Sequence, residues 1–214
     1  MRYKLIIFDL DGTLIDTLSD IQNIFNFVLK TNNLKEKSRL FYKNNIGNGV
    51  EHLLNKCLPN NYTGNFNNLL QFSKKCYGNM LNDKTKIFDG ITTVLEHLKK
   101  NKVKIAVISN KLHSLAIRSV ETYFNSYEIK VIGAEGGFPR KPSPDSTIHM
   151  LKHFNCHSSD ALFVGDSIVD IKTAQHANVS SVGVIWGNGD EEDFKKQKSD
   201  FILYRPQEIF DILD

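Results

Sequence analysis

Short, continuous apolar runs recur along the chain, and each ends in small or acidic residues. Runs that are apolar throughout, rather than alternating, are typical of strands covered on both faces of a parallel sheet. We therefore expect strands over residues 4–9, 104–110, 130–135, 161–166, 180–187 and 201–204.

Stretches with helical periodicity lie between these runs. They predict helices over residues 91–101, 113–124, 145–155 and 170–178. Strand and helix thus alternate from about residue 87 to the end of the chain. This alternation predicts an α/β fold with a doubly wound, Rossmann-like parallel sheet.

The segment after the first run breaks the alternation. Its apolar periodicity predicts helices over residues 18–34, 49–58 and 66–81, with a polar turn between the last two. We therefore predict a small helical cap domain over 16–84, inserted into a core domain formed by 1–15 and 85–214. An insertion at a strand end would lie beside the edge of the sheet where ligands bind.

Composition narrows the function classes. The 214 residues suffice for this architecture, and the net charge of +3 comes from scattered lysines, so we expect no nucleic-acid partner. The three cysteines form no CxxC pair, which indicates free thiols in a reducing compartment. No apolar stretch resembles a secretory signal or reaches the length of a membrane span. We expect a cytoplasmic monomer or homodimer with no membrane partner.

Polar side chains follow the predicted strands at the point where each strand ends. Because the carboxyl ends of parallel strands meet at one edge of an open sheet, these side chains should converge there. They are Asp9 and Asp11 after the first strand, Ser109, Asn110 and Lys111 after the second, Lys141 in a later turn, and Asp166 and Asp170 near the fourth.

This combination indicates phosphate chemistry. Several carboxylates need a counter-cation, and hard oxygen ligands in small number suit Mg²⁺, which often shares a site with a substrate phosphate. A hydroxyl, a lysine and the backbone amides after Asp11 would hold a small phosphorylated metabolite. One carboxylate could act as a nucleophile that forms an aspartyl phosphate, and a second as the general acid and base.

Each of these residues also has a purely structural interpretation. Asp9 and Asp11 could form a polar turn. Ser109 could cap the start of the helix over 113–124, and Asp170 could cap its own helix. Asp16 would mark the hinge into the insert rather than take part in chemistry.

Four segments, "FDLDGTLIDT", "VISNK", "RKPSPD" and "VGDSIVDI", resemble in order and separation the four motifs of the haloacid dehalogenase superfamily. The resemblance covers nearly the whole chain. It implies that Asp9 is the nucleophile and Asp11 the general acid and base. The implied phosphate-binding residues are Gly12, Thr13, Ser109, Asn110 and Lys141. The implied Mg²⁺ ligands are Asp9, the backbone carbonyl of Asp11 and Asp166, with Asp170 in support.

Asp11 separates two branches of the superfamily. The dehalogenases lack an acid at that position because their leaving group is a halide. An alkoxide leaving group needs a proton, so Asp11 indicates phosphate-ester or mutase chemistry.

Within the superfamily, "IGNGVEHLL", "SNK" and "SSVGVIWGNGDEEDF" resemble phosphoglycolate phosphatases. This resemblance implies a cap whose loop at Ile46, Gly47, Asn48 and Gly49 selects the substrate, with 2-phosphoglycolate as the expected one. A pyrophosphatase, a sugar phosphomutase and a phospho-acceptor signalling module are the alternatives.

Overall fold

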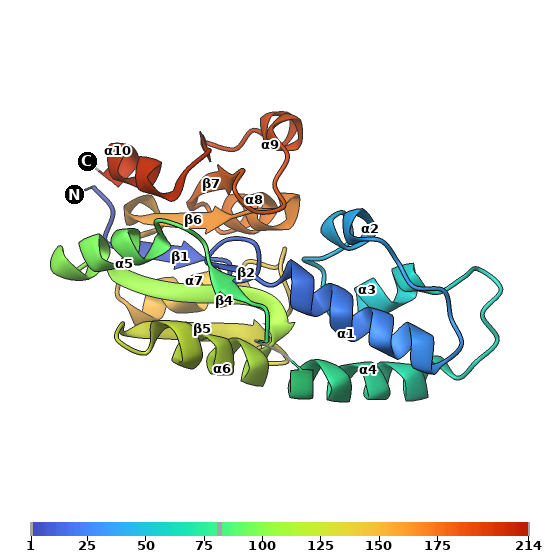
Figure 1. The fold of residues 1–214 in the computed structure, drawn as a ribbon. Coiled ribbons are helices and arrows are strands. Elements are labelled where there is room, and N and C mark those ends of the chain that lie inside the picture. Colours follow the sequence, from blue (N-terminus) through green and yellow to red (C-terminus); the bar gives the residue numbers. More distant parts are fainter. Residues whose placement is uncertain (1, 81–82, 214) are drawn as a thin grey trace.

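The computed structural model describes residues 2–80 and 83–213, and its centre is a six-stranded parallel sheet (Figure 1). In the order β5-β4-β1-β6-β7-β8, neighbouring strands are hydrogen-bonded. The strands are β1 (Leu5–Phe8), β4 (Lys104–Leu112), β5 (Ile129–Ala134), β6 (Ala161–Gly165), β7 (Ser180–Val184) and β8 (Phe201–Leu203). The predicted α/β fold with a parallel sheet is confirmed.

Both faces of the sheet are covered, as the continuous apolar runs require. Along β1, Ile6 and Phe8 pack into one core, whereas Leu5 and Ile7 pack into another on the opposite face. Helices α5 (Ile91–Lys100), α6 (His113–Phe124) and α10 (Phe210–Leu213) supply the first core, and α7 (Asp145–His153) and α8 (Ile168–His176) the second. Side chains of alternate strand residues point to opposite faces, so each strand contributes to both cores.

The helical insert, residues 18–80, lies beyond the carboxyl end of β1, while both chain termini lie at the other end of the sheet (Figure 1). It contains α1 (Leu18–Thr31), α2 (Arg39–Lys43), α3 (Val50–Cys57) and α4 (Phe66–Met80). Its apolar side chains form a third core, which also takes in Leu115 from α6. The insert therefore has its own core and a packed contact with the sheet region.

A two-stranded antiparallel pairing joins the insert to the rest of the chain. In it, β2 (Ile15–Asp16) pairs with β3 (Lys86–Ile87). Nearby, the buried Asp20 carboxylate accepts hydrogen bonds from the backbone N–H groups of Lys84 and Thr85 and from the Thr85 hydroxyl. The outgoing and returning chains are thus held together. The domain limits at 16–84 stay a prediction.

Local predictions differ from the structure in several places. The pairing of β2 with β3 and the helices α2 and α9 (Glu191–Gln197) were not expected. Both helices are short, and each buries a single side chain, Tyr42 and Phe194, so neither leaves a strong apolar period. The β4 strand runs on to Leu112, and β7 ends at Val184 rather than at 187. The predicted helix end at Leu81 lies outside the described residues.

Of the helices in the described ranges, none combines the length and the apolar character needed to cross a membrane.

Candidate active site

The first strand delivers its two aspartates to the edge of the sheet in different ways. The Asp9 backbone N–H still donates to Val164 of β6, so Asp9 stays in the sheet and is buried. The chain then turns tightly: the Gly12 N–H donates to the Ile15 carbonyl, and Gly12 has φ +88°. This left-handed conformation favours glycine. Asp11 sits on that turn and is only partly buried.

Lys141 connects two of the carboxylates. Its ammonium lies 2.7 Å from Asp9 Oδ1 and 2.6 Å from Asp170 Oδ1, and its side chain is 2% exposed. Asp170 also accepts from the backbone N–H and the hydroxyl of Ser167, which completes a capping box at the start of α8. Asp170 therefore caps its helix and pairs with Lys141, so the two interpretations of this residue do not exclude each other.

Asp166 is held from the opposite side. Its Oδ2 accepts from the backbone N–H of Asn188 at 3.0 Å and from its side-chain amide at 2.8 Å. The buried Thr13 hydroxyl lies 3.5 Å from Asp166 Oδ1. Thr13 therefore faces this carboxylate, and its expected contact with a phosphate stays a prediction, as does that of Gly12.

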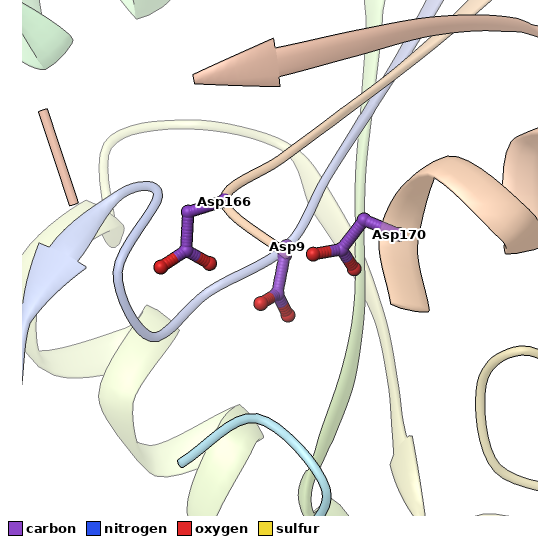
Figure 2. Close-up of side chains that lie close together, drawn as sticks. All are labelled: Asp9, Asp166 and Asp170. Carbon is purple, nitrogen blue, oxygen red and sulfur yellow. The ribbon is translucent and has the colours of Figure 1, made fainter. Parts of the chain in front are cut away.

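Asp9, Asp166 and Asp170 form a buried carboxylate cluster (Figure 2). Each offers an oxygen within 4.8 Å of the others. Burial, opposed by Lys141 and reinforced by Asp170, raises the pKa of Asp9 to about 6. Burial and the charges of Asp9 and Asp170 raise the pKa of Asp166 to about 8. Lys141 pairs with only two of these three carboxylates, and their all-oxygen donor set fits a hard cation such as Mg²⁺.

Ser109 and Asn110 lie on the buried end of β4, beside Asp9. The cap of α6 is Leu112, so Ser109 does not begin that helix. The Asn110 side chain is bound to backbone: it accepts from the Lys141 N–H and donates to the carbonyls of Lys141 and Gly47. Asn110 thereby places the lysine loop and the insert loop relative to β4.

Lys111 contacts Asp11 from the far side of the site. Its ammonium lies 2.7 Å from Asp11 Oδ1 and 3.2 Å from the Tyr77 hydroxyl of α4. The sequence places Lys111 at this edge but assigns it no role, and Tyr77 was not among the expected site residues. A strand extended by two residues would have placed Lys111 on the same side as Ser109, which is the signal that was available. Asn188 was missed as well, although it directly follows the strand expected over 180–187, and that position was the available signal.

The predicted insert loop lies over this edge. Ile46, Gly47 and Gly49 line a cavity together with Asp9 and Asp11. Asn48 lines a neighbouring cavity that also reaches Asp11 and Asp166. The structure therefore brings all four loop residues to the mouth of the site; their role in substrate selection stays a prediction.

A sheet edge with a buried carboxylate cluster, a paired lysine and a helical insert above it defines the class of protein. The chain belongs to the haloacid dehalogenase-like hydrolase family, whose model matches residues 6–184. It is a hydrolase of that family, related to phosphatases.

Individual relatives match over nearly the full length. A phosphoglycolate phosphatase of Aquifex aeolicus is 31% identical over 99% of this chain and 97% of its own. A protein of Caldanaerobacter subterraneus is also 31% identical, over 95% of this chain and 91% of its own; it is named pyrophosphatase PpaX, an assignment that the name gives as provisional. A crystal structure from Haemophilus somnus, described as a predicted phosphoglycolate phosphatase, superposes with a TM-score of 0.90 at 26% identity, covering 100% of this chain and 99% of the other.

Proposed function

We propose that the protein is a Mg²⁺-dependent phosphatase that hydrolyses a small phosphomonoester, with 2-phosphoglycolate as the substrate. The observation that carries the proposal is the arrangement of Asp9 and Asp11. Asp9 is buried against Lys141 within the carboxylate cluster, whereas Asp11 is partly open to the cavity beside it. Such unequal surroundings suit a nucleophile and a general acid. The full-length phosphoglycolate phosphatase relatives support the substrate.

The metal would be held by Asp9, Asp166 and the Asp11 backbone carbonyl, with Asp170 acting through Lys141. When bound, Mg²⁺ supplies positive charge that neutralises the carboxylates and the phosphate oxygens. Asn188 keeps Asp166 turned towards the cluster, and Lys141 keeps Asp9 in place.

The reaction would proceed in two steps on Asp9. A carboxylate oxygen of Asp9 attacks phosphorus, the bond to the ester oxygen breaks, and Asp11 donates its proton to the departing alkoxide. A water molecule then attacks the phosphorus of the aspartyl phosphate, Asp11 accepts its proton, and phosphate leaves with the Asp9 carboxylate restored. Ser109, Lys141 and backbone N–H groups near Gly12 and Asn110 would hold the phosphoryl oxygens.

The helical insert would act as a cap over this reaction. Its loop at 46–49 lines the cavity, and Asn110 donates to its Gly47 carbonyl at 3.1 Å. Closure would keep bulk water from the aspartyl phosphate until the hydrolytic step. The composition supports a cytoplasmic location, and we keep a monomer or homodimer as part of the proposal.

A pyrophosphatase is the second candidate, favoured by the PpaX relative. An assay of phosphate release from 2-phosphoglycolate, pyrophosphate and glucose phosphates, with Mg²⁺ and with EDTA, tests both. We expect 2-phosphoglycolate to be the best substrate and EDTA to abolish release. Faster release from pyrophosphate would favour the second candidate, and interconversion of glucose phosphates without release would indicate a mutase. Activity unaffected by EDTA would contradict the proposal.

A further inference from the structure

Lys111 is a buried cation that the reaction outlined above does not use. Its side chain is fully buried, whereas its partner Asp11 is 16% exposed. Its second partner, the Tyr77 hydroxyl, comes from the helical insert rather than from the sheet. The ammonium also lies 5.2 Å from the centre of the Tyr77 ring. One lysine therefore joins the expected general acid to the insert.

The Lys111–Tyr77 pair has hydrogen-bond donor capacity left for a ligand. The Lys111 ammonium is ion-paired with the Asp11 carboxylate at 2.7 Å and donates to the Tyr77 hydroxyl at 3.2 Å. Burial, opposed by Lys111, raises the pKa of Tyr77 to about 12, so its hydroxyl keeps its hydrogen. Tyr77 accepts from Lys111, and within residues 2–80 and 83–213 no acceptor is found for its own hydrogen. Tyr77 can therefore donate to an anion.

The cavity beside this pair is small and mostly apolar. It measures about 40 Å³, room for a few water-sized groups. Of the described residues that line it, Lys111 alone is cationic. The remaining walls include Ile21, Phe25 and Val50 of the insert. An anionic group that entered this cavity would lose water, and Lys111 and Tyr77 are the groups placed to replace it.

We propose that Lys111 and Tyr77 form a subsite for a second anionic group in the leaving part of the substrate. The proposal rests on the proposed phosphatase function and specifies its substrate class: small phosphate esters or anhydrides that carry a carboxylate or a further phosphate next to the scissile phosphate. The ammonium would share its hydrogen bonds between Asp11 and this anion. Because Tyr77 belongs to the insert, the subsite is complete only when insert and sheet are together.

The test compares two substrates of nearly equal size, 2-phosphoglycolate and 2-hydroxyethyl phosphate. The first carries a carboxylate where the second carries a hydroxymethyl group. Pyrophosphate is the third substrate and distinguishes a phosphate anion from a carboxylate. The variants are Lys111→Met, Tyr77→Phe and, as a control, Lys75→Met, which removes an exposed charge from the same helix as Tyr77. Thermal unfolding checks that each variant is folded.

We expect wild type to prefer an anionic substrate over 2-hydroxyethyl phosphate. Lys111→Met should reduce that preference in kcat/KM by about 100-fold, the scale of a lost hydrogen bond between charged groups. Tyr77→Phe should reduce it less, and Lys75→Met should leave it unchanged. Equal losses on both substrates would overturn the subsite, since Lys111 would then act through Asp11 alone. A wild type without preference would overturn it as well.

A binding measurement separates this proposal from the proposed function. If wild type hydrolysed none of the three substrates, the function would fail, and the subsite would be decided by calorimetry on Asp9→Asn. The subsite is supported if Asp9→Asn binds 2-phosphoglycolate or pyrophosphate more tightly than 2-hydroxyethyl phosphate, and if this difference in affinity is lost in Asp9→Asn/Lys111→Met. If Asp9→Asn and Asp9→Asn/Lys111→Met bind the anionic ligands with equal affinity, the subsite is overturned.

Discussion

Lys141 and Asp9 are joined across the sheet edge by an ion pair of 2.7 Å, and the side chains on both sides are almost completely buried. The same ammonium reaches Asp170 at 2.6 Å, so one positive charge serves two buried carboxylates. Removing one member of a buried ion pair is costly, because its partner stays charged and loses its compensation. The lysine should therefore matter for stability as well as for catalysis.

Lys141→Met should lower the free energy of unfolding by about 3–5 kcal/mol, the usual cost of leaving a buried charge unpaired. Urea unfolding of the metal-free protein at neutral pH measures this loss. Lys172→Met, which removes an exposed lysine from α8, is the control and should change stability little. Similar unfolding curves for both variants would show that the ion pair does not stabilise the fold.

Asp9→Asn should remove turnover while the protein stays folded. The substitution removes the proposed nucleophile, and losses of at least about 1,000-fold are typical for such a change. Because burial raises the pKa of Asp9 to about 6, the charged carboxylate costs stability at neutral pH without metal. Lys141 keeps Asp170 as its partner in this variant, so the neutral amide should unfold at no lower a temperature than wild type in EDTA. Phosphate release near the wild-type rate would rule out Asp9 as the nucleophile.

The sequence predicted the positions of polar residues that directly follow a strand better than the positions of residues that meet only through tertiary contacts. Asp9 and Asp166 follow continuous apolar runs, so the sheet itself dictates their place. Lys111 and Tyr77 are brought together only when α4 packs against the end of β4, and no local pattern encodes that contact. Asn110 illustrates the same limit, since its side chain binds backbone of two distant loops.

Stability of the metal-free protein should fall as the pH rises from about 4 to about 8. The pKa of Asp166 is raised to about 8 in the folded state, and that of Asp9 to about 6, chiefly by burial. The folded state therefore holds protons that the unfolded chain, with aspartate pKa values near 3.9, has already released. The favourable contribution is complete below pH 4 and is lost as each carboxylate ionises.

Added Mg²⁺ should oppose this loss, because it replaces the protons as the compensating charge. Thermal unfolding in EDTA and in Mg²⁺, across this pH range, measures the effect: the two curves should lie close together near pH 5 and separate towards pH 8. Stabilisation by Mg²⁺ that does not depend on pH would contradict the assignment of the metal to the Asp9 and Asp166 carboxylates.

Gly12 should tolerate no side chain, because it faces Asp166 directly. A Cβ atom built there would clash with Asp166 Oδ2 and would lie 2.6 Å from the Asn188 amide nitrogen. The residue also has φ +88°, which costs a non-glycine residue about 1–2 kcal/mol. Gly12→Ala should therefore destabilise the protein and displace Asp166 and Asn188, which lowers the affinity for Mg²⁺.

Gly137→Ala separates the two effects of that substitution. Gly137 has a similar φ of +92°, but a Cβ atom there would meet nothing within 4 Å. It should cost comparable backbone energy and leave the carboxylates where they are. Titration of Mg²⁺ against thermal unfolding should show weaker binding in Gly12→Ala and wild-type binding in Gly137→Ala. Equal affinities for Mg²⁺ in the two variants would mean that Asp166 keeps its position even when residue 12 carries a side chain. Glycine at residue 12 would then be required only by the backbone conformation of the turn after β1.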